Sequence, residues 1–326
     1  MRNPAQSFEH WLADPAARRT TQRRVDACAA RWGRGPVHAR FDAAMAALPC
    51  ETAEAIADAM LGLFSDGAWL DTLIGSLSAE LSVDPFFEPP FPPLATEVHH
   101  GLIVFEDPRL TIAAGVMAIG ALAARKSRPR GATSVGLSGR MSVFKFLNAG
   151  DARISLWEAP QVGADFSAAS AGSCVRTGER RLADGDVLII DGRRQSYVVE
   201  HARSSLLILQ AEIMLDQAPV SVEFDSATGL YVGCSANGDG ASRIQMLTTL
   251  LRKLEAPQAF AAIAGFLDHE DFFVRWHAMR ELLGIDLAAA LPRLRAMAAG
   301  DPHPEPRRAA GALIERIEAG NSRKAA

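Results

Sequence analysis

Polar side chains gathered around one predicted strand turn could bind a small anion. They are Arg193, Arg194, Gln195, Ser196 and Tyr197, directly after Asp191. Guanidinium groups bind carboxylate or phosphate through charge-assisted, often bidentate hydrogen bonds. Trp157 could add an apolar wall beside them. The alternative is an exposed turn whose arginines pair with Asp191 or Glu200.

Histidines and carboxylates elsewhere in the same region raise the alternative of a metal site. His201, with His99 or His100 and with Glu106 or Glu158, has the composition of a two-His-one-carboxylate site for Fe, Mn, Ni or Zn. His99 and His100 are adjacent, so on a regular strand they point to opposite faces and cannot both bind one ion. We expect no cofactor, and keep this divalent-metal site as the alternative.

Two common catalytic signatures are missing from the sequence. No serine lies in a G-x-S-x-G segment, and the glycine-containing stretch 237–240 lacks the lysine that follows a phosphate-binding loop. We therefore predict no catalytic residue.

The charge distribution disfavours general binding to nucleic acid. The 326 residues include 34 Lys and Arg against 38 Asp and Glu, a net charge of −4. Residues 1–40 contain eight arginines, whereas residues 41–108 contain twelve acidic residues and no Lys or Arg. We expect these groups to pair within the chain or across a dimer. Nucleic-acid association through the arginine-rich N-terminus is the alternative.

Cysteine usage and hydropathy favour a protein of the cytoplasm. Cys28, Cys50, Cys174 and Cys234 are scattered, as expected of free thiols. The first twenty residues show no secretory signal. The longest apolar run, Leu110 to Ala124, is shorter than the ~20 residues that cross a bilayer, so we expect no membrane partner.

The hydrophobic periodicity divides the chain into three parts. Residues 1–94 show helical spacing and end in a Pro-rich stretch that no helix can cross. Its phenylalanines are expected to pin it to a neighbouring surface. Residues 95–238 contain short β-like runs separated by turns, which indicate an antiparallel sandwich or barrel. Residues 239–326 return to the helical period. The predicted strands are 98–105, 142–147, 153–157, 187–190, 197–199, 206–213, 220–224 and 230–233.

A near-repeat within the last part carries the first family resemblance. Val274-Arg275 with Ala278 and Leu282 is echoed by Pro306-Arg307 with Ala310 and Ile314. Residues 255–319 therefore resemble HEAT-like helical repeats, in which this Arg opens the second helix of a pair and commonly binds a nearby acid. Two such units need further support from the preceding helix, the N-terminal helices or a second subunit.

The segment Leu182 to Gly192 carries the second resemblance. A glycine and an acid at a turn, followed by a hydrophobic strand, resemble the second motif of the cupins, whose fold is a double-stranded β-helix jelly roll. The metal-binding cupins continue with Pro, Gly and a ligand His, where this sequence has Asp191, Arg193 and Ser196. The first cupin motif implies His-x-His and Glu, but residues 142–158 contain no histidine. The resemblance thus implies a cupin without its usual metal site.

Taken together, these patterns predict an α+β protein with N-terminal helices, a central antiparallel cupin-like jelly roll and C-terminal HEAT-like helical repeats. We expect a non-catalytic ligand-binding or scaffold protein whose helices bind a partner protein or form a homodimer. A small anion is the expected ligand. A metal-dependent cupin enzyme, such as a dioxygenase or isomerase with rearranged ligands, is the alternative.

Overall fold

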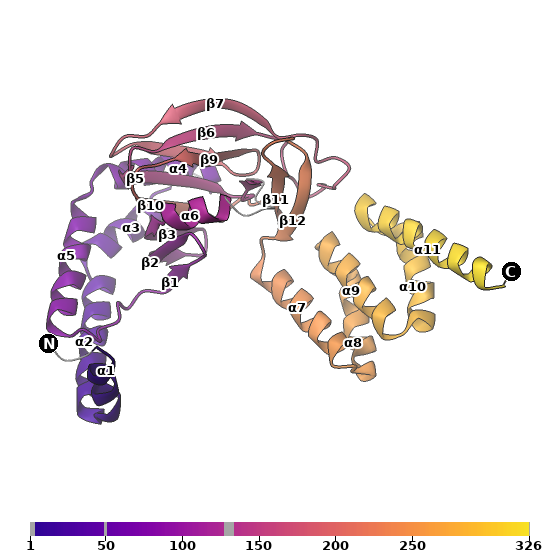
Figure 1. Cartoon of the computed structure of the whole chain (residues 1–326), viewed down its shortest axis with the longest axis horizontal. Helices are drawn as coiled ribbons and strands as arrows, with labels where there is room; N and C mark the ends of the chain where they lie inside the picture. Colours follow the sequence, from indigo (N-terminus) through magenta and orange to yellow (C-terminus); the bar gives the residue numbers. More distant parts are fainter. Residues whose placement is uncertain (1–3, 49–50, 127–133, 326) are drawn as a thin grey trace.

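A computed structural model describes residues 4–48, 51–126 and 134–325 of the chain. It places helices at both ends and antiparallel sheets between them, which confirms the predicted α+β class (Figure 1). Among the described residues, no helix is long and apolar enough to cross a membrane.

The N-terminal part consists of five helices. They are α1 (Pro4–Ala13), α2 (Pro15–Gly33), α3 (Pro36–Ala46), α4 (Ala53–Ser65) and α5 (Ala68–Val83). Asp14 begins α2 as its N-cap by accepting a hydrogen bond from the Ala16 backbone N–H at 2.8 Å. Thr52 caps α4 in the same way through the Ala55 N–H. The apolar faces of α4 and α5 bury Ile56, Phe64 and Trp69.

The predicted pairing of charges within the N-terminal part is confirmed. Glu80 on α5 binds Arg24 and Arg31 of α2 at 3.0 and 2.8 Å, and Arg40 binds Asp66 at 2.6 Å. The hydrogen bonds from Arg31 and Arg24 hold the pKa of Glu80 below its ordinary value. The basic residues of the first forty are therefore partly neutralised by acids from the next segment.

The Pro-rich segment after α5 is held against the helices and the sheet. No helix crosses it, as its prolines predict: α5 ends at Val83 and strand β1 follows at Pro93. Phe87 and Phe91 are buried in the core that the helices share with the sheet, and Phe86 stacks on Trp11. The phenylalanines thus fix the segment as expected.

Among its described residues, the central part contains twelve strands and one short helix. They are β1 (Pro93–Ala95), β2 (His99–Asp107), β3 (Leu110–Met117), α6 (Ile119–Lys126), β4 (Ser134–Leu137), β5 (Met141–Asn148), β6 (Arg153–Glu158), β7 (Val175–Arg181), β8 (Val187–Asp191), β9 (Gln195–His201), β10 (Leu206–Ile213), β11 (Val220–Asp225) and β12 (Tyr231–Ala236).

The strand order is that of a jelly roll. One sheet runs β1-β2-β3-β10-β5-β8 and another runs β7-β6-β9, both antiparallel. Strand β4 lies beside β9, where the Ser196 hydroxyl donates to the Gly136 carbonyl at 2.6 Å. Two facing four-stranded arrays result, β3-β10-β5-β8 and β4-β9-β6-β7, as in double-sheet jelly rolls. Strands β11 and β12 extend the second array beyond β4.

Two cores meet at the first sheet. Between the arrays lie apolar side chains from both, including Phe144, Phe146, Ile154 and Leu206. The opposite face of the first sheet packs on the N-terminal helices through residues such as Val143. The first sheet is therefore covered on both faces, because its strands contribute apolar residues to each.

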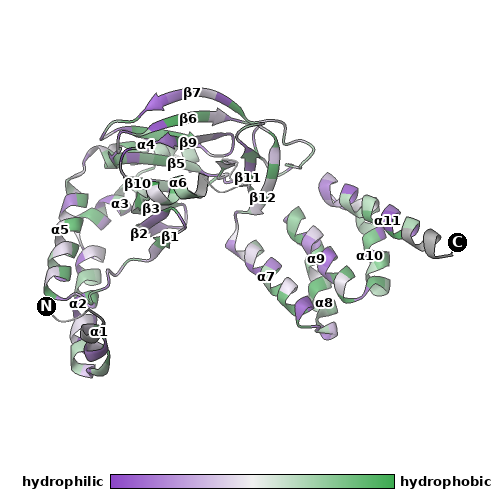
Figure 2. Cartoon of the chain, viewed as in Figure 1, coloured by the Kyte–Doolittle hydropathy of each residue, from purple (hydrophilic) through white to green (hydrophobic). Residues whose placement is uncertain are grey.

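Four strands were not predicted from the sequence: β1, β3, β4 and β7. The apolar run Leu110 to Ala124, read only as buried protein, divides into β3 and α6. Strand β7 was not predicted, because its sequence VRTGERR is polar throughout and most of it is exposed. Figure 2 shows β7 largely in the hydrophilic colour. It forms an edge of its sheet, where a strand needs no apolar face of its own.

The C-terminal part is a stack of helices. They are α7 (Asp239–Lys253), α8 (Phe260–Ala264), α9 (Phe272–Ile285), α10 (Leu287–Gly300) and α11 (Pro304–Ala325), with 3₁₀ turns at Pro257–Ala259 and Gly265–Asp268. Of the three supports considered for the repeat pair, the preceding helix, α7, packs against α9. Phe273 and Glu305 also reach the jelly roll: Phe273 packs on its outer core, and Glu305 accepts from the Ala168 N–H at 3.2 Å.

A buried ion pair links the two repeats. Arg275, in the first turn of α9, donates to both carboxylate oxygens of Asp301 at 2.9 and 2.7 Å. It also donates to the backbone carbonyls of His269 and Glu270. Arg275 and Asp301 side chains are 6% and 3% exposed. The expected arginine–acid contact is thus present, and the acid comes from the loop between α10 and α11, the two helices of the second repeat.

Candidate functional site

The β8–β9 turn, predicted to hold an anion, uses its arginines within the chain. Arg193 donates from Nε to Asp191 Oδ1 at 2.7 Å and from a terminal nitrogen to Oδ2 at 3.1 Å. It also donates to Glu54 on α4 at 3.2 Å, and Arg194 lies 3.5 Å from Asp191. Burial would raise the pKa of Asp191, but the Arg193 hydrogen bonds outweigh burial and keep this pKa below its ordinary value. Asp191 therefore pairs with both arginines, as the alternative interpretation predicts, but the turn is not exposed, because the side chains of Arg193 and Asp191 are only 15 and 14% exposed.

The remaining residues of the predicted anion site have separate roles. The Gln195 amide donates to Glu158 at 2.9 Å, and Ser196 holds β4 to β9 as described. Tyr197 lies in the interior against Phe144, where burial raises its pKa. Trp157 is buried and donates to the Ser155 hydroxyl at 2.8 Å. The polar groups of Gln195, Ser196 and Trp157 are thus taken up by structural contacts.

The residues of the alternative metal site are distributed over the jelly roll. His99 and His100 line a small pocket with Met117 and Gln210, and burial lowers the pKa of His99. His201 lies in a different pocket, among arginines. Glu158 binds Gln195, and Glu106 is paired in register with Thr111. In the described part of the chain, no three His, Cys, Asp or Glu side chains are grouped as metal ligands.

Polar side chains that enter the jelly roll are also paired. On β10, Gln210 donates to Glu212 at 2.9 Å. Glu212 binds Arg140 at 3.3 Å, and Arg140 continues to the Gln217 side chain and the Asn237 carbonyl. This chain of contacts ties β10 to the loop before β5 and to the end of β12.

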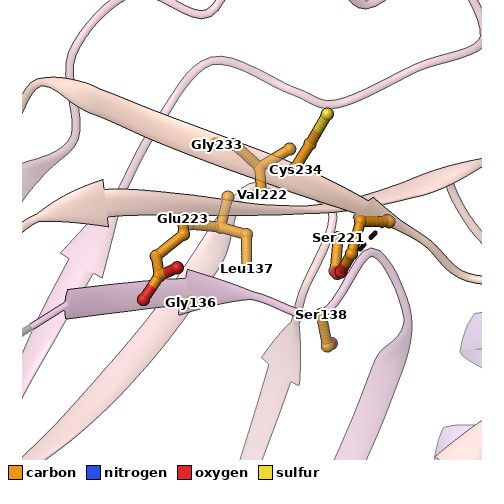
Figure 3. A pocket seen from close by; sticks show the side chains of 9 residues that line it. Gly136, Leu137, Ser138, Ser221, Val222, Glu223, Gly233 and Cys234 are labelled. Atoms are coloured by element: carbon orange, nitrogen blue, oxygen red, sulfur yellow. Dashed lines mark hydrogen bonds between the residues drawn. The ribbon is translucent and has the colours of Figure 1, made fainter. Parts of the chain in front are cut away.

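A groove of about 440 Å³ crosses the β12-β11-β4 sheet (Figure 3). Its lining includes Gly136, Gly233, Ser221, Glu223 and the exposed thiol of Cys234. The Ser221 and Ser235 hydroxyls hydrogen-bond to each other at 2.7 Å. Figure 3 shows the Glu223 carboxylate apart from this serine pair. The groove thus has one charged side chain in its lining and no converging set of charges.

Helix α7 packs with its polar side inward. Thr249 donates to Glu281 of α9 at 3.0 Å, and His277 Nε2 lies 3.0 Å from the Gln245 carbonyl. Arg252 binds the same Glu281, which is buried. Burial, the largest effect, lowers the pKa of His277. Polar contacts of this kind hold α7 to α9.

The outer side of α7 carries an exposed row of apolar residues, here called the α7 row. Met246, Leu247, Leu250 and Leu254 are 71, 58, 50 and 66% exposed. The sequence predicts an apolar stripe on this helix, and three of its leucines belong to the α7 row. An exposed apolar patch on a helix often marks an interaction surface.

One pocket was missed by the sequence analysis. Asp151, Arg153, Arg181, His201 and Arg203 line a cavity of about 230 Å³ at one end of the β6, β7 and β9 strands. The turn at 148–151 was predicted, but β7 was not, so nothing in the sequence placed Arg181 beside Arg153. We call this cavity the arginine pocket.

Comparison with known proteins gives a family match for the C-terminal helices. Residues 232–315 match the family model for HEAT repeats, a segment that also includes α7. No curated protein matches the sequence. Among solved structures, the chain is similar to an ectoine synthase from P. lautus, at 9% identity and TM-score 0.23, over 37% of this chain and 67% of that one.

Two further solved structures are similar to part of the chain. A cupin domain from Bordetella pertussis Tohama I has 12% identity and TM-score 0.21, over 37% of this chain and 97% of that one. An oxalate decarboxylase from Lactobacillus farciminis has 14% identity and TM-score 0.22, over 49% of this chain and 38% of that one. The family-model match thus agrees with the HEAT-like repeats expected in the C-terminal helices.

Proposed function

We propose that this chain is a non-catalytic scaffold protein whose HEAT-like helices pair with a second copy of the chain. The observation that carries the proposal is the orientation of α7. Its buried side forms hydrogen bonds to α9, and its exposed side bears the α7 row. A surface helix of a globular protein normally presents the opposite arrangement.

The charges around the α7 row favour a second copy as its occupant. Asp239, Arg243 and Lys253 are exposed at the same side of α7, and none forms an ion pair with another described residue. In an antiparallel pair of α7 helices with a twofold axis near Met246, Asp239 lies level with Lys253 of the second copy. The symmetry repeats this contact at the other end, so an isologous interface pairs Asp239 and Lys253 of each copy with the opposite charge on the other copy.

The jelly roll supports the non-catalytic part of the proposal. Phe144, Phe146 and Tyr197 fill the space between its sheets. The arginines of the β8–β9 turn stabilise that turn through Asp191. The free thiols of Cys28, Cys174 and Cys234 are in keeping with a reducing cytoplasm, where we propose that the protein acts; Cys50 lies outside the described residues.

Sedimentation equilibrium at micromolar concentration tests the self-association. We expect a dimer for the wild type and a monomer for Leu250→Glu, because the new carboxylate would be buried without a partner in the apolar interface with the second copy. Leu287→Glu is the matched control, since Leu287 on α10 is 49% exposed and lies outside the α7 row. This control should remain a dimer.

Two results would contradict the proposal. One is a monomeric wild type at these concentrations, even if α7 then binds another protein. The other is a dimer that survives Leu250→Glu. Circular dichroism of each variant establishes that the helices remain folded, so a change of mass reports association alone.

A further inference from the structure

Strand register forces three basic side chains together in the arginine pocket. Arg153 on β6 is the direct partner of Arg181 on β7 and of His201 on β9. Side chains of directly opposed residues lie on the same face of a sheet, and like charges in such positions destabilise it. Arg203, in the loop after β9, adds a further guanidinium to the same lining.

One carboxylate, that of Asp151, pairs with two of these basic side chains. Asp151 binds Arg181 Nε at 2.6 Å through Oδ1 and Arg203 Nε at 3.1 Å through Oδ2. The Arg181 hydrogen bond lowers the pKa of Asp151, so this side chain is ionised at neutral pH. Three guanidiniums against one carboxylate leave a formal charge of +2 in the lining.

Of the three arginines that line the pocket, Arg153 is the one without a carboxylate partner among the described residues. Within the described residues, its guanidinium makes no ion pair or side-chain hydrogen bond, although it lies between two basic neighbours. The turn before it is well fixed: the Arg203 N–H donates to the Gly150 carbonyl at 2.8 Å, and Gly150 N donates to Asn148 at 2.8 Å. The backbone of this turn is therefore fixed, and the side chains of Arg181 and Arg203 that line the pocket are 74 and 78% exposed.

We propose that the arginine pocket binds a phosphate group, with Arg153 as its principal ligand. The forked donors of arginine match the oxygens of a phosphate dianion, whose two negative charges balance the +2 of the lining. This site is separate from the β8–β9 turn and from the α7 row, and the inference does not depend on how the chain associates.

Isothermal titration with inorganic phosphate tests the proposal, at an ionic strength held constant with sodium chloride. We expect saturable binding by the wild type and a loss of about tenfold or more in affinity for Arg153→Gln, since a charged hydrogen bond is removed. Arg18→Gln on α2 is the matched control: it removes one exposed arginine elsewhere and should bind as the wild type does.

Asp151→Asn separates ligand binding from a structural role. Asp151 has a positive φ of 55°, which asparagine tolerates, so the turn is retained. Because the substitution releases Arg181 and Arg203 from a competing carboxylate, phosphate affinity should rise. A fall in affinity would mean that Asp151 serves only to shape the pocket, and would overturn the charge argument.

The source of the phosphate group is distinguished by a second titration, with glycerol 3-phosphate. Tighter binding than that of inorganic phosphate indicates the phosphomonoester of a small molecule, and equal or weaker binding indicates free phosphate. The absence of saturable binding of both compounds to the wild type would overturn the proposal. So would equal affinities of the wild type and Arg153→Gln.

Discussion

In the jelly roll, Phe146 and Leu206 lie between the sheets and arginines such as Arg153 lie at the surface. In the C-terminal helices, Arg275 is buried with Asp301, whereas Leu250 is exposed. The jelly roll closes its apolar faces on one another and on the N-terminal helices. A stack of repeats has two ends, and among the described residues α7, the first helix of the stack, has no further repeat packed on its outer apolar side. The comparison shows that the jelly roll is stabilised by apolar side chains buried between its sheets. The C-terminal helices leave apolar surface exposed, and this surface is available for association.

The largest effect is expected from breaking the buried pair of the helical repeats. Arg275→Ala should destabilise these helices by about 3–5 kcal/mol, because Asp301 is left as an uncompensated buried charge. Urea denaturation gives the free energy of unfolding, and hydrogen exchange of α9 and α10 locates the loss. Arg295→Ala is the control, since Arg295 and Glu318 form an exposed pair at 3.8 Å. Equal losses of unfolding free energy in Arg275→Ala and Arg295→Ala would contradict the prediction that the buried pair contributes more than an exposed one.

The same substitution, leucine to alanine, can be made in the jelly roll and in the C-terminal helices to compare the two regions directly. Leu206→Ala should cost about 2–5 kcal/mol, since Leu206 is fully buried between the sheets and leaves a cavity. Leu250→Ala should change the unfolding free energy of the monomer by about 0.5 kcal/mol or less, because that side chain faces solvent. Denaturation at concentrations below dimer formation makes the measurement. A large cost at Leu250 would show that the α7 row stabilises the fold itself.

The smallest effect is the contribution of one buried carboxyl of the helical repeats to the loss of stability at acid pH. Burial opposes ionisation of Asp301, but the Arg275 hydrogen bonds and the His303 backbone N–H keep its pKa below the ordinary 3.8. Such a carboxyl contributes stability above its unfolded pKa and loses that contribution as pH falls through the folded pKa. The helices of the wild type should therefore lose stability below about pH 4. Arg275→Ala should lack this loss, and an unchanged pH profile would contradict the assignment.

The fold was largely predictable because its signals are local. Alternation along β5 and β10, the turns around Gly185 and Gly192, and the Pro-rich boundary all follow from neighbouring residues. Strand β7 was missed because it is stabilised by pairing with β6 rather than by an apolar face. The run from Leu110 was not divided, since apolar residues fit both a buried strand and a helix.

The candidate sites were harder to predict because they depend on contacts distant in sequence. Asp191 was recognised as a partner for Arg193, but Glu54 comes from α4 and could not be foreseen. The arginine pocket combines residues from two turns and three strands, so its existence depends on register. The apolar stripe of α7 was correctly located, yet periodicity does not tell which side of a helix meets a neighbour.

The contact between Glu305 and the Ala168 backbone has a mechanical consequence. The C-terminal helices are joined to the sheets by the chain at 237–238 and, separately, by Glu305 and Phe273. A single tether would leave a hinge about which the helices could swing, whereas two separated attachments resist that rotation. A force that rotates α7 therefore also acts on the β-sheets, and the C-terminal helices and the sheets move as one rigid unit.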